Sequence, residues 1–212
     1  MPDRQSHQQQ VRAFLQSHFQ TQDWQFELPH GWGHETYFAH GGGQAYFVKL
    51  GVQARRYQVV GALGLTPPVL ASGELEDGTP LIVQPRIAGR TPTRTDYRTH
   101  LEQFAGTIRR LHHCAELQSL LPEADSERYC EAGMQSLRRI RGKWLHYREQ
   151  VAEVAGYVDE SLEELTRRVG SFQGSGLVAS HNDICNANWL VTPDGQLYLI
   201  DLESMSLDDP AL

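Results

Sequence analysis

Cysteine is scarce in this sequence, where Cys114, Cys130 and Cys185 are the three examples among 212 residues. An odd number of scattered thiols supplies neither a disulfide framework nor the paired spacing of a zinc cluster. No apolar run approaches the ~20 residues that cross a bilayer, and the polar N-terminal segment lacks the apolar stretch of a signal peptide. We therefore expect a reduced, cytoplasmic protein without a membrane partner.

Basic residues are also few. The 26 Asp and Glu residues outnumber the 19 Lys and Arg residues and leave a net charge of -7. A general nucleic-acid binder needs a basic face that attracts phosphate, so nucleic acid is not an expected partner. The hydrophobic fraction of 40% is ordinary for a globular protein, and the length suffices to bury a core. The oligomeric state stays open.

Residue types that bind metals or activate hydroxyls gather near the C-terminal end, around a turn at residues 193–195. A Pro-Asp-Gly turn between two apolar runs is typical of a tight β-hairpin. A loop with Asp183 and Asn188 precedes the first run, and Asp201 follows the second. Because a hairpin brings its ends together, we expect these side chains to converge. Their oxygens suit the orientation of a hydroxyl nucleophile and the binding of Mg²⁺ on a nucleoside triphosphate.

The same stretch resembles the catalytic loop and metal-binding strand end of the protein-kinase-like phosphotransferases, most closely those of the aminoglycoside phosphotransferase and choline-kinase-like branch. That branch carries His-x-Asp-x-x-x-x-Asn, then a hydrophobic strand and Ile-Asp-x-Glu. Here the match is His181-Asn182-Asp183 with Asn188, followed by Ile-Asp-Leu-Glu at residues 200–203. Two surface aspartates and an asparagine in ordinary turns are the alternative interpretation.

The resemblance implies an α+β fold with two lobes. The first lobe would hold an antiparallel five-stranded sheet plus a helix, and the mainly helical second lobe would carry the catalytic β-hairpin. We expect the nucleotide-binding lobe at residues 1–86, a hinge at residues 87–95 and the catalytic lobe at residues 96–212.

The chemistry that the resemblance implies is the transfer of a phosphoryl group from ATP to a hydroxyl of a small molecule, with Mg²⁺ as cofactor. Asp183 would accept the hydroxyl proton or orient the nucleophile, and His181 would brace the loop by hydrogen bonds. Asn188 and Asp201 would hold Mg²⁺ between the phosphates. Glu203 could reach a second metal ion.

Short alternating runs separated by turn residues predict the antiparallel sheet of the first lobe. The segments with strand patterns are residues 24–28, 34–39, 44–50 and 80–85, with a further strand after the Pro67-Pro68 break, and helices are expected at residues 8–20 and 53–63. In the second lobe, apolar periodicity predicts helices at residues 96–117, 126–148 and 149–169, the first of them capped by Asp96.

Lys49 lies inside the apolar strand at residues 44–50. A lysine is costly to bury without an anionic partner, and in the resembled family a lysine at this place binds the α- and β-phosphates. An edge-strand lysine that faces water is the alternative interpretation. Phe47 shares the face of Lys49 by the two-residue period of a strand, so it could form the floor of the nucleotide-base pocket.

Two further places in the first lobe suit a nucleotide. Gly31 and Gly33 lie in the first turn, where a backbone without side chains can approach phosphate oxygens closely, although most turn glycines have no such role. In the resembled fold, the strand before the hinge offers backbone groups to the adenine edge. Because Pro85 has no N–H, Gln84 or Arg86 would be the donor.

The helix expected at residues 53–63 departs from the family pattern, because it contains no carboxylate to pair with Lys49. The first acidic residue after Lys49 is Glu74, and Gln58 stands near the expected place with no charge. This absence favours an alternative function, a catalytically impaired pseudokinase or a nucleotide-binding module. A structural or interaction fragment that binds no nucleotide is a third interpretation.

The last residues leave the acceptor open. Asp209 and Pro210 resemble a helix cap and first turn, and the sequence stops at Leu212. In the resembled family further helices follow and build much of the acceptor pocket, so we expect a fragment or a natural truncation with an incomplete second lobe. Choline or ethanolamine, an aminoglycoside, thiamine, a fructosamine and a methylthioribose-type sugar all stay candidates.

Overall fold

The structure is a computed structural model that describes residues 4–28, 35–121, 126–171 and 176–208. Its first part is a five-stranded antiparallel sheet with strand order β1-β2-β3-β5-β4. The strands are β1 (Gln25–Glu27), β2 (Thr36–Gly41), β3 (Gln44–Leu50), β4 (Ala71–Glu74) and β5 (Pro80–Pro85), and the helices of this part are α1 (Arg4–Phe19) and α2 (Ala54–Ala62). The antiparallel sheet and its helix are as the sequence predicted.

Glycines set the β2–β3 connection that places Lys49. Gly42 and Gly43 both have positive φ, 59° and 74°, which a two-residue hairpin turn of the right twist requires. The register that results pairs Gly41 with Gln44 and Thr36 with Lys49. Since β5 pairs with the other side of β3, Lys49 lies in the middle of the sheet.

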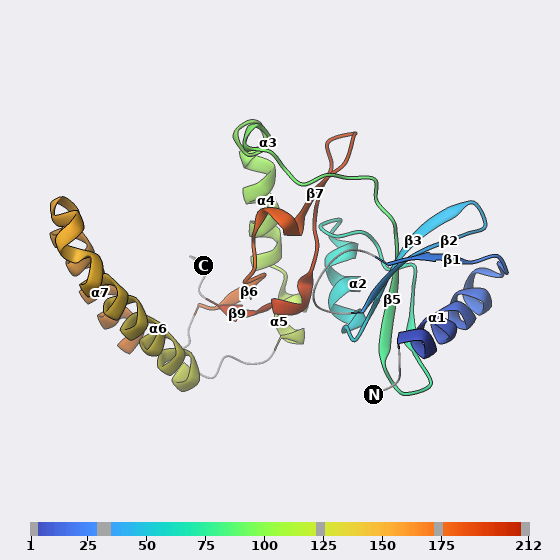
Figure 1. The fold of residues 1–212 in the computed structure, drawn as a ribbon, viewed down its shortest axis with the longest axis horizontal. Helices are drawn as coiled ribbons and strands as arrows, with labels where there is room; N and C mark the ends of the chain where they lie inside the picture. The colour runs from blue at the N-terminus through green and yellow to red at the C-terminus, as the bar shows by residue number, and fades with distance from the viewer. Residues whose placement is uncertain (1–3, 29–34, 122–125, 172–175, 209–212) are drawn as a thin grey trace.

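Helix α1 lies on one face of the sheet and α2 on the other (Figure 1), and each face belongs to a different core. On one face, Val48 and Leu81 pack with Val11 and Leu15 of α1. On the other face, Ile82 joins residues of α2 and of the second part of the chain. The shared members of that larger core are Tyr57, Val60, Leu65, Phe104, Leu111, Leu117, Trp189, Leu199 and Leu202. The face that carries Lys49 is therefore the one that meets the second part.

Helix α1 is tied to the sheet by a buried histidine. The Nδ1 atom of His7 lies 2.7 Å from Glu35 Oε2, and its Nε2 atom lies 3.1 Å from Asp77 Oδ2. Hydrogen bonds to Glu35, and next to Asp77, raise the His7 pKa above its ordinary value of 6.5. Both ring nitrogens donate in this arrangement, which describes a protonated imidazole between two carboxylates.

We expect His7 to make folding stability depend on pH. Because its pKa is raised in the folded chain, the stabilisation is fully present below pH 6.5 and is lost as pH rises through the folded pKa. Chemical denaturation between about pH 6 and pH 9 should show this loss in the wild type and not in His7→Gln. His18→Gln, on the exposed side of the same helix, is the control and should keep the wild-type dependence. Equal slopes in all three proteins would contradict the assignment.

The second part of the chain begins with three short helices, α3 (Arg94–Thr99), α4 (Leu101–His112) and α5 (Ala115–Leu120), so the prediction of one helix over residues 96–117 is wrong. Thr93 is the N-cap, and Asp96 is the third residue of a reciprocal capping box rather than the cap. The break between α4 and α5 has a packing reason. In a straight helix, Leu117 would point roughly 120° away from Leu111, whereas here both reach the same core.

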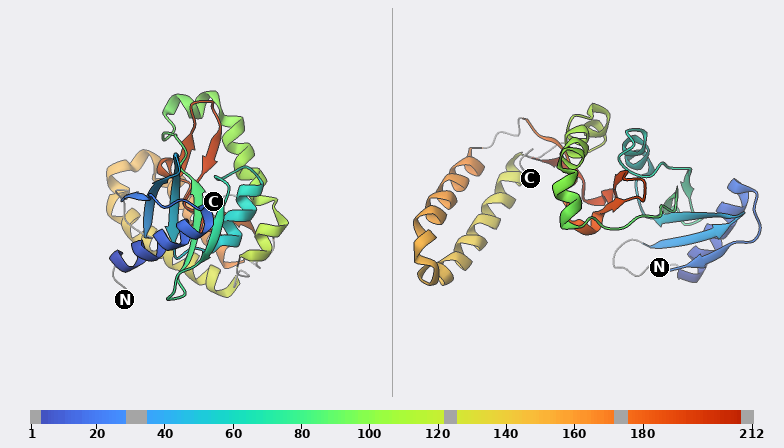
Figure 2. Two further views of the ribbon diagram at one scale, coloured as in Figure 1. Left: turned by 90° about the vertical axis from the view of Figure 1, so that its right-hand side faces the viewer. Right: turned by 90° about the horizontal axis from the view of Figure 1, so that it is seen from above.

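A helical pair, α6 (Ser126–Tyr147) and α7 (Ala155–Gly170), extends away from the rest of the molecule in Figure 1 and in the right view of Figure 2. The expected helix at residues 149–169 starts late, because a 3₁₀ segment, η1 (Arg148–Val154), forms the connection. Asp159 joins the pair by accepting hydrogen bonds from Trp144 Nε1 at 2.8 Å and Arg148 Nε at 2.9 Å. No helix in the described ranges is long and apolar enough to cross a membrane.

Two small antiparallel sheets complete the chain. The strands β7 (Trp189–Val191) and β8 (Leu197–Leu199) form the predicted hairpin, and β6 (Val178–Ser180) pairs with β9 (Ser206–Asp208). Short 3₁₀ segments, η2 (Asn186–Asn188) and η3 (Leu202–Ser204), lead into β7 and out of β8. The predicted helix cap at Asp209 and Pro210 lies outside the described residues.

Candidate active site

The hairpin brings the two predicted motifs side by side. Trp189 pairs with Leu199, and the Ile200 N–H donates to the Asn188 carbonyl at 2.9 Å. At the turn, Gly195 has a φ of 85°, which glycine adopts without steric cost. The end of the predicted catalytic loop at Asn188 is therefore next to Asp201, as the hairpin geometry requires.

Asn188 holds the Asp183 carboxylate of the loop that precedes β7. Its Nδ2 donates to Asp183 Oδ2 at 2.8 Å and to the Asp183 carbonyl at 2.9 Å, from a position where the side chain is buried. Asp183 itself is exposed. Asn182, just before it, has a φ of 60° and donates from Nδ2 to the Ser204 carbonyl at 3.3 Å. The loop is thus fixed on both sides of a carboxylate that faces solvent.

His181 is fully buried beneath this loop. Its Nε2 lies 2.9 Å from the Ile200 carbonyl, which can only accept, so Nε2 carries the proton. Burial lowers the His181 pKa and keeps the ring neutral. Ser204 Oγ donates to the His181 carbonyl at 2.8 Å. These contacts join the loop to the residues around Asp201 and hold it in place.

Lys49 is buried, with 6% of its surface exposed, and it points at the residues that follow β8. Its Nζ lies 2.6 Å from Asp201 Oδ1 and 2.7 Å from Glu203 Oε2. The alternative of an edge lysine that faces water is therefore wrong. This ion pair joins a residue of the five-stranded sheet to two residues near the C-terminal end of the described chain.

Asp201 reaches the lysine through an unusual backbone conformation. Its φ of 64° and ψ of 62° are left-handed, a region that costs energy for a residue other than glycine. The kink ends β8 and starts η3, so that Asp201 and Glu203 both turn toward Lys49. The Asp201 side chain stays 49% exposed, whereas that of Glu203 is 21% exposed.

Helix α2 contributes a different residue from the one that sequence reasoning suggested. Gln58 Nε2 lies 3.4 Å from Ser72 Oγ rather than at the lysine. The residue that reaches Lys49 is Tyr57, whose hydroxyl oxygen is 3.4 Å from Lys49 Nζ and 2.5 Å from Glu203 Oε1. A tyrosine on the apolar face of α2, preceded by two arginines, was the available sequence signal.

The structure describes some, but not all, of the residues of the first lobe that were predicted to bind the nucleotide. The rings of Phe47 and Phe38 lie 5.7 Å apart on the Lys49 face of the sheet, and the Arg86 guanidinium stacks 4.0 Å from the Phe38 ring centre. The Arg86 N–H donates to the Ala45 carbonyl at 2.9 Å, so it is already bonded within the sheet. Gln84 is buried and paired with Phe47 in register. Their adenine contacts stay predictions, and Gly31 and Gly33 lie outside the described residues.

The donor set beside Lys49 fits Mg²⁺ in its chemistry. Asn188 donates through Nδ2, which leaves its amide oxygen as an acceptor, and the Asp201 carboxylate is half-exposed. Within the described ranges, no group of three or more His, Cys, Asp or Glu side chains is arranged as a metal site. One carboxylate and one amide oxygen are sufficient for Mg²⁺, because this ion keeps waters and takes phosphate oxygens as its other ligands.

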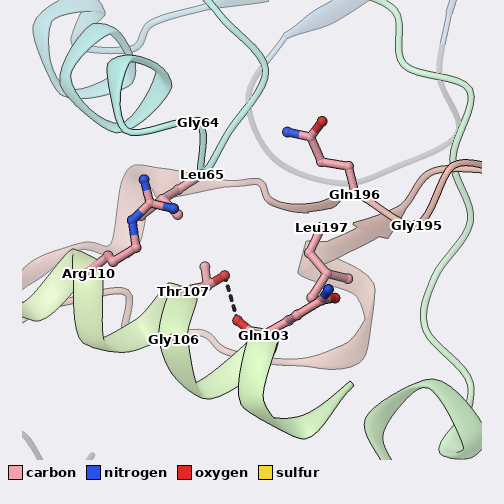
Figure 3. Close-up of a pocket in the computed structure, with 9 residues that line it drawn as sticks. All are labelled: Gly64, Leu65, Gln103, Gly106, Thr107, Arg110, Gly195, Gln196 and Leu197. Carbon is pink, nitrogen blue, oxygen red and sulfur yellow. Dashed lines mark hydrogen bonds between the residues drawn. The ribbon is translucent and has the colours of Figure 1, made fainter. Parts of the chain in front are cut away.

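A separate cavity of about 350 Å³ lies at the turn end of the hairpin (Figure 3). Its lining comes from the segment after α2, from α4 and from the hairpin turn, namely Gly64, Leu65, Gln103, Gly106, Thr107, Arg110, Gly195, Gln196 and Leu197. None of the predicted catalytic or metal-binding residues lines it. The cavity is therefore distinct from the candidate active site.

Comparison with known proteins finds one matching family and several solved structures with a similar fold. Residues 26–212 match the family described as "Phosphotransferase enzyme family". A spectinomycin phosphotransferase in complex with ADP and spectinomycin has a TM-score of 0.63 and 16% identity, over 95% of this chain and 70% of that one. Choline kinase LicA from Streptococcus pneumoniae has a TM-score of 0.59 and 18% identity, over 96% and 71%. These similarities confirm the kinase-like α+β fold.

Proposed function

The chain belongs to the phosphotransferase enzyme family, and from that premise we propose that it transfers the γ-phosphoryl group of ATP to a hydroxyl of a small molecule. The observation that carries the proposal is the meeting of Lys49 with Asp201, next to the Asp183–Asn188 pair. A buried cation, an oriented carboxylate and hard oxygen donors are the parts that phosphoryl transfer needs. The nucleotide would lie between residues 1–86 and 96–212, with residues 87–95 as the hinge.

Each side chain has a task that follows from its surroundings. Asp183 is exposed and held by the Asn188 amide, so it can accept a hydrogen bond from an acceptor hydroxyl and align the oxygen for attack. Phosphoryl transfer proceeds through a loose transition state in which alignment matters more than full deprotonation. Lys49 would neutralise phosphate charge, and His181 would keep the loop in place. Mg²⁺, held by Asn188 and Asp201, would supply further charge neutralisation at the phosphates.

The missing helix carboxylate favoured an impaired enzyme, and the contacts of Lys49 weaken that argument. Asp201 and Glu203 supply two carboxylates to the ammonium, so the lysine has its counter-charge from another part of the chain. Spectinomycin phosphotransferase binds ADP and spectinomycin, and another relative, aminoglycoside phosphotransferase APH(4)-Ia, binds ADP and hygromycin B. These relatives support ATP as donor and a small hydroxyl compound as acceptor.

The proposal is tested by phosphoryl transfer from ATP labelled in its γ-phosphate. The acceptor panel comprises choline, ethanolamine, aminoglycosides, thiamine, a fructosamine and methylthioribose, each assayed with and without Mg²⁺. We expect one class to become labelled in the presence of Mg²⁺ and not in its absence. Nucleotide binding without transfer to any acceptor would favour the nucleotide-binding module instead, and absence of nucleotide binding would overturn both.

A further inference from the structure

Helix α2 faces Lys49 with a hydroxyl instead of a carboxylate. Tyr57 is 3% exposed, and its ring belongs to the core shared by α2 and the second part of the chain. The sequence of α2 contains no acidic residue. The polar tip of Tyr57 is therefore the group that this helix directs at the lysine.

The hydrogen bonds of the Tyr57 hydroxyl can be assigned completely. It donates to Glu203 Oε1 at 2.5 Å and accepts from the Leu202 N–H at 3.3 Å, while Lys49 Nζ lies 3.4 Å away as a weaker donor. Burial, and next the charge of Glu203, raise the Tyr57 pKa above its ordinary value, so the phenol keeps its proton. A protonated phenol has one proton to donate, and Glu203 receives it.

Arg56, the preceding residue of α2, fixes the backbone of the same segment. Its Nη1 donates to the Leu202 carbonyl at 2.9 Å and to the Glu203 carbonyl at 3.1 Å. Glu203 is thus held at its backbone by Arg56 and at one carboxylate oxygen by Tyr57. Its other carboxylate oxygen is 2.7 Å from Lys49. Asp201 has no corresponding contact with α2 among the hydrogen bonds of the described residues, and its side chain is half-exposed.

We propose that Tyr57 is a positioning residue that holds Lys49 for the phosphates of the nucleotide through Glu203. The helix supplies a hydroxyl, and residue 203 supplies the carboxylate that a helix residue would otherwise provide. Glu203 is then the permanent partner of the lysine rather than a ligand of a second metal. Asp201 is the carboxylate that is free to bind Mg²⁺. The inference rests on the proposed function, because it requires that Lys49 binds phosphate.

Tyr57→Phe is the direct test, since it removes the hydroxyl and keeps the ring in the core. We expect calorimetric titration with ADP and Mg²⁺ to show roughly five- to tenfold weaker binding, the effect of one lost hydrogen bond. Binding of adenosine, which has no phosphate, should be unchanged. Tyr46→Phe is the matched control, because Tyr46 packs between Phe19 and Trp24 on the α1 side of the sheet. It should bind both ligands as the wild type does.

A double-mutant cycle tests whether Tyr57 influences ADP binding through Glu203. If Tyr57 acts through Glu203, Tyr57→Phe should cost nothing further in a Glu203→Gln background, whereas independent effects would add. Unchanged ADP affinity in Tyr57→Phe, equal losses for ADP and adenosine, or full additivity would each overturn the inference and leave the proposed function standing. A wild-type protein that binds no ADP would overturn both. Should Tyr57→Phe fail to fold, the ADP-to-adenosine comparison in Glu203→Gln tests the same link.

Discussion

Lys49→Met should lower the affinity for ADP and Mg²⁺ by about 100-fold, the cost expected when one partner of a desolvated charge pair is removed. Methionine fills most of the volume of the buried lysine stem and removes the charge. The ammonium is 2.6 Å from Asp201 and 2.7 Å from Glu203. Without the ammonium, the phosphates of ADP have no cation to contact. The Asp201 and Glu203 carboxylates then repel each other, and they also repel the phosphates.

The same substitution should lower the free energy of unfolding by about 1–3 kcal/mol. A fully buried pair costs more when one partner is removed, and the half-exposed Asp201 side chain reduces that cost through solvent screening. Lys143→Met, at an exposed position of α6, is the control and should change neither quantity. An ADP affinity within twofold of the wild type in Lys49→Met would show that the lysine does not bind phosphate.

Asp183→Asn should reduce turnover roughly 10²–10⁴-fold, the usual contribution of a positioned acid–base group. Asparagine keeps the shape of the side chain and an oxygen for the Asn188 amide, so the loop should stay in place. The charge that orients the acceptor hydroxyl is lost. ADP affinity should stay close to the wild-type value, because the proposed role of Asp183 is to contact the acceptor rather than the nucleotide.

The matched control for this position is Asp194→Asn, at the turn of the same hairpin. The Asp194 carboxylate contacts the Thr192 hydroxyl at the far end of the hairpin from Asp183. Steady-state kinetics with the acceptor found in the transfer assay should show normal turnover in Asp194→Asn. Wild-type turnover in Asp183→Asn would refute its catalytic role.

The parts that sequence reasoning predicted are those whose geometry is set locally. The hairpin at residues 193–195 follows from turn chemistry, and it suffices to place Asn188 beside Asp201. Each of these features depends on neighbours within a few residues, so a pattern in the chain records them.

The parts that escaped prediction depend on packing between distant segments. Which α2 residue reaches Lys49 depends on the rotation of the helix about its axis, and neighbouring helical positions differ by about 100°. That rotation is set by contacts such as the one between Tyr57 and Glu203, which are separated by 146 positions. The break between α4 and α5, at His113 and Cys114, likewise lets Leu111 and Leu117 share one core, although the apolar stripe alone suggested a continuous helix.

The proposal that Lys49, Asn188 and Asp201 form a magnesium–nucleotide site is tested most directly by thermal unfolding of the wild-type chain with ADP. A ligand that binds the folded state raises the unfolding midpoint as its concentration rises. We predict a rise that grows with ADP concentration in the presence of Mg²⁺, that is much smaller without Mg²⁺, and that is lost in Asp201→Asn. A midpoint that ADP and Mg²⁺ leave unchanged at every concentration would contradict the proposal.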